Sequence, residues 1–106
     1  MKLRAILPAA LLAACAGGAL AQDAGKSLHL KSLAATCANC HGTGGRAVEG
    51  SAVPGLAGMP AGYFSEQMKA FKSGARPATV MHQLAKGYSE TQIEQLAAYF
   101  SAQPRN

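Results

Sequence analysis

The chain has 106 residues, of which 49% are hydrophobic and 14% charged, and its formal net charge is +5. This length fits one domain, and the absence of any basic run interleaved with aromatic residues argues against a nucleic-acid-binding surface. Only three Tyr and three Phe occur, without Trp. We therefore expect a small apolar core that needs further stabilisation from a covalent or bound group.

The first residues have the pattern of an export signal. Lys2 and Arg4 precede an apolar run, Ala5–Ala14, and Ala19-Leu20-Ala21 has the A-x-A form of a cleavage site. The apolar run is too short to span a bilayer. We predict a signal peptide at residues 1–21 and a periplasmic product in a bacterial cell.

Cys15 allows a second interpretation of this segment. Leu12-Ala13-Ala14-Cys15 resembles a bacterial lipobox, in which the Cys is lipidated and becomes the new N-terminus. In the other interpretation, Cys15 is only a small apolar residue of the signal. Because the A-x-A site is well formed, we favour cleavage after Ala21 and a domain of residues 22–106 without a lipid anchor.

Four helical stretches are expected in that domain, and no segment alternates as a strand does. Pro and Gly mark several of the helix ends, and a Gly-rich loop is expected from Gly42 to Gly58. Before the last helix, the Ser89 hydroxyl and Gln92 form a capping-box pattern. Gln103 to Arg105 look like a fraying tail. The expected helices are Ser27–Cys40, Ala61–Lys72, Ala78–Lys86 and a last one beginning at Ser89.

The end of the first helix carries the most informative motif. Residues 37–41 read Cys-Ala-Asn-Cys-His, the C-x-x-C-H pattern of covalent c-type haem attachment. Because residues three apart on a helix face the same way, the Cys37 and Cys40 sulfurs can meet one porphyrin edge while His41 reaches the iron. The motif occurs once, which predicts one haem c per chain, and the haem would supply the missing apolar centre.

Two other uses of the cysteines fit less well. A thioredoxin-like C-x-x-C belongs in a strand–helix–strand context, which the pattern lacks. A zinc site would need a fourth ligand near His41 and usually a second Cys or His pair. We therefore interpret Cys37 and Cys40 as thioether positions and His41 as an iron ligand.

The second iron ligand decides what such a haem can do. Methionine closes the iron for electron transfer and raises its potential, whereas an open position allows ligand binding or catalysis. We choose Met81, forty positions after His41, with Met59, eighteen positions after it, as the next candidate. Met68 lies on a helical apolar stripe and is expected in the core.

Two histidines and one proline complete the candidates. His82 adjoins Met81, so a one-residue rotation of that helix would present an imidazole instead. His29 is expected to face solvent. Pro54 is assigned a supporting role, because a ligating His usually donates its other ring N–H to a carbonyl and the loop can bring the Pro54 carbonyl to His41. The alternative is that Pro54 only stiffens the loop.

Several segments together resemble class I cytochrome c. They are the C-x-x-C-H motif, the Pro54-Gly55-Leu56-Ala57-Gly58 loop, the distal Met81 and the ending Leu96-Ala97-Ala98-Tyr99-Phe100. The same loop followed by Tyr63, and the segment Gln67–Gly74, are similar to the cytochrome c4/c553 group. Ala78–Ser89 resembles the cytochrome subunit of flavocytochrome c sulfide dehydrogenase.

The resemblance implies an all-α class I cytochrome c fold, with about four short helices wrapped around one covalent haem. It implies that His41 and Met81 are the axial ligands and that a periplasmic flavoprotein subunit oxidises sulfide and passes single electrons to the haem. No catalysis is expected from the chain alone. Its mild positive charge would favour an acidic redox partner.

One departure and three alternatives accompany this interpretation. Known members of the sulfide dehydrogenase group can carry two haem domains, whereas this chain has one motif. The chain could therefore be a free c4/c553-like carrier that shuttles electrons to a terminal oxidase or reductase. A haem enzyme or gas sensor would need a labile sixth ligand. A thiol oxidoreductase would need free Cys37 and Cys40.

Overall fold

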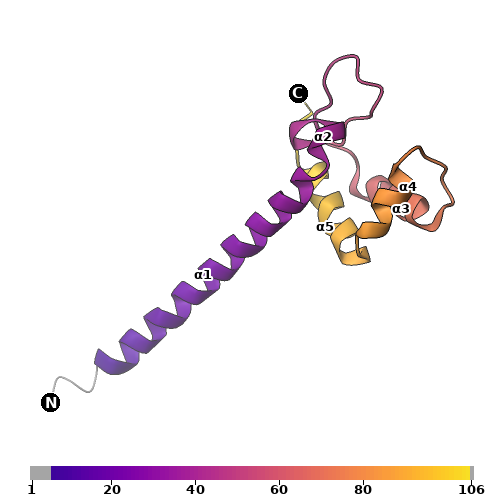
Figure 1. The fold of residues 1–106 in the computed structure, drawn as a ribbon. Helices are drawn as coiled ribbons and strands as arrows, with labels where there is room; N and C mark the ends of the chain where they lie inside the picture. Colours follow the sequence, from indigo (N-terminus) through magenta and orange to yellow (C-terminus); the bar gives the residue numbers. More distant parts are fainter. Residues whose placement is uncertain (1–5, 106) are drawn as a thin grey trace. The chain divides into compact units, whose positions relative to one another are not determined.

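The computed structural model describes residues 6–105, and their side chains from residue 18 onward. All regular elements among these residues are helical, which confirms the all-α prediction (Figure 1). In chain order they are α1 (Ile6–Ala35), α2 (Ala38–His41), the 3-10 turn η1 (Thr43–Gly45), α3 (Ala61–Ser73), α4 (Met81–Leu84), the 3-10 turn η2 (Ala85–Gly87) and α5 (Glu90–Ser101).

The chain divides into two compact units, residues 1–31 and residues 32–106. The first unit contains most of α1, and its His29 side chain is exposed as predicted. Helix begins at Ile6 rather than at Ser27, because the Ala- and Leu-rich segment before Ser27 has high helix propensity. None of the helices within residues 6–105 is both long and apolar enough to cross a membrane. Residues 1–5 of the predicted signal peptide lie outside the described residues.

The predicted helix Ser27–Cys40 is interrupted at Thr36 and Cys37. The backbone N–H groups of these two residues donate to Leu33 O and Ala34 O, at 3.2 and 3.1 Å, in the i to i−3 pattern of a tightened turn. The Thr36 hydroxyl also donates to Leu33 O at 2.7 Å. Because this hydroxyl competes for a helical carbonyl, α1 ends at Ala35 and the separate turn α2 follows.

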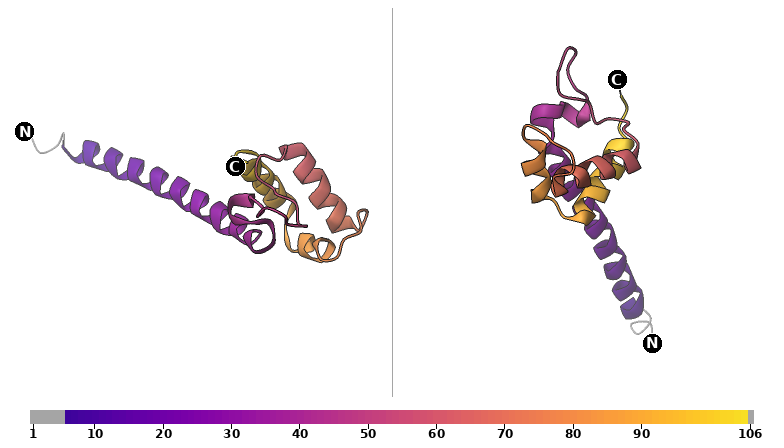
Figure 2. Two further views of the ribbon diagram at one scale, coloured as in Figure 1. Left: turned by 90° about the horizontal axis from the view of Figure 1, so that it is seen from above. Right: turned by 90° about the vertical axis from the view of Figure 1, so that its right-hand side faces the viewer.

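The core of the second unit is built where α3 and α5 pack side by side (Figure 2). The Phe64 and Phe100 rings stack with centroids 5.7 Å apart, and Tyr99 meets Phe100 edge-on. Met68 is buried, which confirms its predicted core role. The buried apolar side chains are Ala34, Leu56, Phe64, Met68, Ala85, Ile93, Leu96, Ala97 and Phe100.

The ends of α3 and α5 follow the local signals. α3 begins at Ala61 as predicted and extends one residue further, to Ser73, where Gly74 takes a left-handed φ of 82°. The predicted capping box is present before α5. Gln92 N donates to Ser89 Oγ at 3.1 Å, and Ser89 N donates to Gln92 Oε1 at 2.9 Å.

Two predictions about helix ends were wrong. The helix expected at Ala78–Lys86 begins only at Met81, because the φ of Val80, −135°, lies outside the helical range, and it tightens into η2 at Ala85. The C-terminal tail, expected to be loose, makes two hydrogen bonds with the rest of the fold. Gln103 Nε2 donates to Tyr99 O at 3.0 Å, and Arg105 Nη2 donates to Gly58 O at 2.9 Å.

Candidate functional site

The C-x-x-C-H residues form one turn of helix, as expected from their spacing. Cys37 is the residue before α2, and the N–H groups of Cys40 and His41 both donate to Cys37 O, at 3.4 and 3.0 Å. Cys37 and Cys40 do not form a disulfide with each other, and Cys37 is half-buried whereas Cys40 is exposed. This turn brings two sulfurs and one imidazole together on a short, hydrogen-bonded segment.

Glycines turn the chain sharply after His41. Gly42 has φ +85°, and a Cβ there would collide with the main-chain carbonyl of Arg46. The loop then returns, because Gly45 O accepts hydrogen bonds from Leu56 N at 2.7 Å and from Ala57 N at 3.0 Å. The Gly-rich stretch therefore folds the segment around Pro54 back beside α2.

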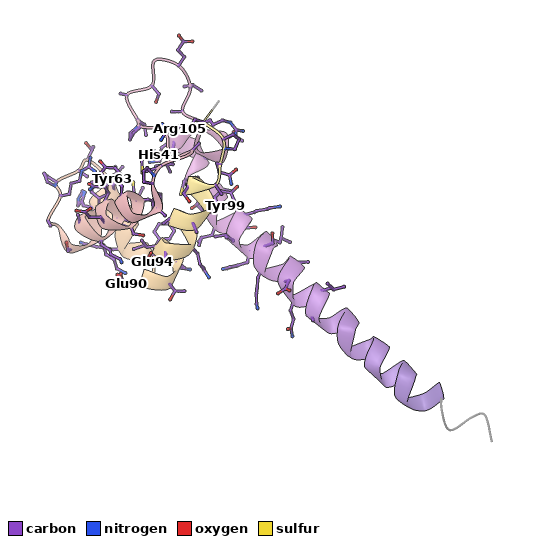
Figure 3. The ribbon with its side chains drawn as sticks, turned by 180° about the vertical axis from the view of Figure 1, so that it is seen from behind. His41, Tyr63, Glu90, Glu94, Tyr99 and Arg105 are labelled. Carbon is purple, nitrogen blue, oxygen red and sulfur yellow. The ribbon has the colours of Figure 1, made fainter. Side chains whose placement is uncertain are left out.

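The returning loop fixes the His41 ring. His41 Nδ1 lies 2.6 Å from Pro54 O, the hydrogen bond that the sequence analysis expected (Figure 3 labels His41). A carbonyl oxygen only accepts, so Nδ1 carries the hydrogen and Nε2 is the nitrogen with a free lone pair. An imidazole held in this way has the orientation and tautomer of a metal ligand.

Two hydroxyl groups lie beside the Cys37 sulfur. Thr36 Oγ1 is 4.0 Å from Cys37 Sγ and 2.8 Å from the Tyr88 hydroxyl. Burial raises the pKa of the Cys37 thiol, and the hydrogen bonds of Thr36 and Tyr88 partly oppose this rise. Thr36 and Tyr88 could not be identified from the sequence, because a contact over 52 positions leaves no local pattern.

The candidate sixth ligands lie at the edge of the core. Met81, the first residue of α4, and Met59, in the loop before α3, are both half-buried and pack against the core cluster. His82 is half-buried, and its Nδ1 has no hydrogen-bond partner within the described residues. The choice of Met81 as iron ligand stays a prediction.

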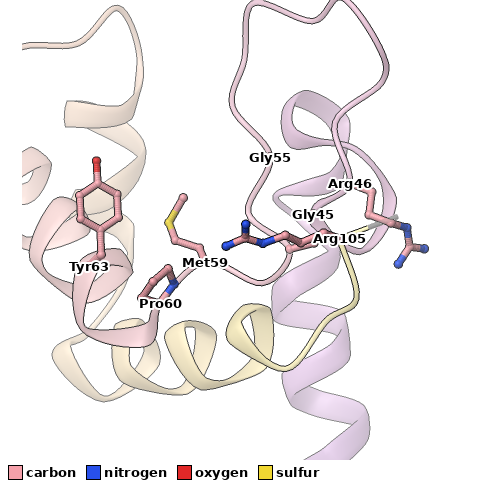
Figure 4. A pocket seen from close by; sticks show the side chains of 8 residues that line it. Gly45, Arg46, Gly55, Met59, Pro60, Tyr63 and Arg105 are labelled. Carbon is pink, nitrogen blue, oxygen red and sulfur yellow. The ribbon is translucent and has the colours of Figure 1, made fainter.

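A pocket of about 430 Å³ lies beside the Gly-rich loop (Figure 4). Arg105 reaches it from the C-terminal tail, a contribution that the sequence analysis missed because no local signal joins the tail to Gly58. Apart from Arg105, its walls come from Gly45, Arg46, Gly55, Ala57, Met59, Pro60 and Tyr63.

Residues 23–103 match the family model described as Cytochrome c. The chain belongs to the cytochrome c family. It is therefore an electron carrier of the all-α class I cytochrome c fold, and the family implies covalently bound haem c. The predicted resemblance is confirmed.

Curated relatives agree with this assignment. The chain is 43% identical over 68 residues to the "Thiosulfate dehydrogenase electron acceptor" of Thiomonas intermedia, covering 64% of this chain and 31% of that protein. It is 40% identical over 68 residues to the "Cytochrome subunit of sulfide dehydrogenase" of Chlorobaculum tepidum, covering 64% and 60%. It is 34% identical over 84 residues to cytochrome c4 of Pseudomonas aeruginosa, covering 79% and 41%. The chain thus spans about a third of the first of these relatives.

The residues present fit a covalently attached haem. The donor set is two thiols three positions apart on one turn and an imidazole whose Nε2 is available. Large apolar side chains also remain uncovered near Met81, since Val80 and Leu84 are 54% and 52% exposed. Such surface suits contact with a large apolar group.

Proposed function

We propose that this cytochrome is a periplasmic one-electron carrier with one haem c, attached through Cys37 and Cys40 and ligated by His41 and Met81. The bound haem supplies the Fe(III)/Fe(II) couple. The observation that carries the proposal is the 2.6 Å hydrogen bond from His41 Nδ1 to Pro54 O. It leaves Nε2 as the nitrogen that would bind the metal, and it would make Nε2 more basic.

Each chain residue has a defined task in this proposal. Cys37, at the N-cap of α2, and Cys40, within α2, would hold the group through thioether bonds. Pro54 O holds the His41 ring in one orientation. Met81 begins α4 against the core, a well-supported position from which its sulfur would close the sixth coordination position. A closed site with a Met ligand favours electron transfer over binding of small ligands.

We propose that the electrons come from a dehydrogenase acting on an inorganic sulfur compound. The proposal is supported by the names of two relatives, a thiosulfate dehydrogenase electron acceptor and a cytochrome subunit of sulfide dehydrogenase. The resemblance of Ala78–Ser89 favours the flavoprotein subunit of a sulfide dehydrogenase as the donor. Signal-peptide cleavage after Ala21, without a lipid on Cys15, would deliver residues 22–106 to the periplasm.

A second candidate is a free carrier that shuttles electrons to a terminal oxidase or reductase. The similarity to cytochrome c4 over 79% of the chain favours it. In both cases the chain transfers electrons and performs no substrate chemistry.

The ligand assignment is tested with Met81→Ala and its matched rival Met59→Ala in the haem-loaded protein. We expect the native protein and Met59→Ala to show the sulfur-to-iron absorption band in the ferric state and to bind carbon monoxide slowly. Met81→Ala should lose the band and bind carbon monoxide at once. The opposite pattern would assign Met59, and rapid binding by the native protein would contradict the carrier function.

The donor is tested by purifying the protein from the native periplasm. A co-purifying flavoprotein that reduces the haem on addition of sulfide supports the subunit proposal. If thiosulfate, with a different co-purifying partner, reduces the haem, the donor is a thiosulfate dehydrogenase instead. A haem that neither compound reduces in the periplasmic extract contradicts the sulfur-oxidation proposal and favours the free carrier. Intact-mass measurement of the product tests cleavage after Ala21.

A further inference from the structure

Arg105 is held in place although its side chain is exposed. Its Nη2 donates to Gly58 O at 2.9 Å. Its stem lies against Gly58, where an added Cβ would be 2.7 Å from Arg105 Cγ and Nε. Gly58 is fixed in turn, because its φ is +68° and its N–H donates to Phe100 O at 2.8 Å. The guanidinium is thus positioned by the fold.

The guanidinium points into the pocket. Figure 4 shows the Arg105 side chain directed toward Met59, whereas the Arg46 guanidinium on the same wall is directed away. The pocket wall includes no Asp or Glu among the described residues, and no ion pair in that part of the chain involves Arg105. A guanidinium has five N–H donors, and the Gly58 carbonyl occupies one. The remaining donors form a fork that matches a carboxylate.

The pocket adjoins the segment that holds His41. Gly55, the residue after the acceptor Pro54, forms part of the pocket wall. Gly45 and Ala57 also line the pocket, and the hydrogen bond from Ala57 N to Gly45 O closes the loop. Haem c carries two propionate carboxylates. A fixed cation without a carboxylate partner beside the haem-binding loop is therefore suited to one of them.

We propose that Arg105 binds a carboxylate in this pocket and that this carboxylate is a haem propionate. The proposal rests on the haem attachment proposed above. An adjacent cation lowers the pKa of a carboxyl group by stabilising its ionised form. It also offsets the negative charge of the propionate, which would otherwise stabilise ferric iron and lower the reduction potential.

The test is the pH dependence of the reduction potential of haem-loaded Arg105→Gln. We expect the propionate pKa seen in this titration to rise by about one to three units, and the potential at neutral pH to fall. Arg105→Lys keeps the charge but loses the planar fork, so its propionate pKa and its reduction potential should lie between those of the native protein and those of Arg105→Gln. The matched control is Arg46→Gln, which removes the same charge from the same wall and should leave the titration close to native. An Arg105→Gln titration identical to native would overturn the proposal.

Two further readouts identify the source of the carboxylate and separate the two proposals. The potential of the native protein should not depend on acetate concentration at constant ionic strength. A dependence present in the native protein and absent in Arg105→Gln would assign the site to a solution carboxylate and overturn the propionate assignment. A haem stain after denaturing electrophoresis and the sulfur-to-iron band are recorded for each protein. If the native protein lacks the haem stain and the band, the proposed function is contradicted. If both are present and the Arg105→Gln titration equals that of native protein, only the role of Arg105 is contradicted.

Discussion

The Tyr88 hydroxyl lies 2.8 Å from the hydroxyl of Thr36, the residue that precedes the first cysteine of the haem motif. On its backbone side, the Tyr88 carbonyl accepts a 2.5 Å hydrogen bond from Lys72 Nζ of α3. One half-buried residue between η2 and α5 therefore connects the turn before α2 with α3. Its two contacts hold together segments that are far apart in the sequence.

Tyr88→Phe should lower the free energy of unfolding of the haem-loaded protein by about 0.5–1.5 kcal/mol, because it removes one hydrogen bond and keeps the ring. Denaturation with guanidinium chloride measures this change. Tyr99→Phe is the control, since Tyr99 is also half-buried and its hydroxyl has no hydrogen bond within the described residues. Equal losses in the two variants would show that the Thr36 contact does not stabilise the fold.

Gly45→Ala should be more destabilising than Gly74→Ala. Both glycines have left-handed φ angles, 78° and 82°. A Cβ on Gly45 would lie 2.9 Å from both Ala57 N and Phe100 Cδ1, whereas one on Gly74 meets nothing within 4 Å. We expect about 1–2 kcal/mol of backbone strain in each variant and a further 1–3 kcal/mol of overpacking in Gly45→Ala. Thermal unfolding of the two proteins compares them, and equal midpoints would contradict the close packing at Gly45.

Ser89→Ala should destabilise the protein by about 1 kcal/mol, because the N-terminus of α5 loses the hydroxyl that accepts from Gln92 N. Urea unfolding gives the value. The control is Ser101→Ala at the other end of α5, where the hydroxyl donates only to Ala98 O and Ala has the higher helix propensity. We expect that control to be neutral or slightly stabilising; a loss as large as that of Ser89→Ala would contradict the capping role.

Glu94 should contribute to the acid sensitivity of the fold. Lys69 Nζ lies 2.6 Å from Glu94 Oε1 and the Ser65 hydroxyl donates to Oε2 at 2.9 Å (Figure 3 labels Glu94 on α5). The hydrogen bond from Lys69, then that from Ser65, lowers the pKa of the Glu94 carboxyl. Its contribution is therefore present above the pKa of the unfolded chain and is lost as pH falls through the lower pKa of the folded state.

Glu94→Gln should accordingly show a smaller loss of stability than the native protein between about pH 5 and pH 3. Urea unfolding at a series of pH values measures it. Glu66→Gln is the control, since Glu66 is exposed on α3 and has no ion pair within residues 6–105. Because the Glu94 pair is exposed, added salt should reduce the difference. An acid profile of Glu94→Gln that matches native protein at low salt would contradict the prediction.

Features with a local cause could be predicted from the sequence. The capping box depends on Ser89 and Gln92, three positions apart, and α3 is bounded by Pro60 and Gly74. Met68 was recognisable as a core residue because its neighbours on the helix are aromatic. Even the His41–Pro54 hydrogen bond could be anticipated, since glycines allow the loop between them to return.

Contacts that depend on the tertiary fold could not be predicted. The helical periodicity runs through Thr36, so the break there becomes visible only when its hydroxyl is seen bonded to Leu33 O. Arg105 and Gly58 are 47 positions apart, and nothing in either segment indicates the other. The residues missed at the site are those whose partners lie far away in the chain.

The acceptor that orients the His41 ring is a main-chain oxygen. Every amino acid carries such a carbonyl, so no replacement of the side chain at position 54 can delete the acceptor. A point mutation at position 54 therefore leaves an acceptor for the His41 ring in place. Selection would act instead on the path of the loop, and above all on Gly42, where any side chain would collide with the Arg46 carbonyl.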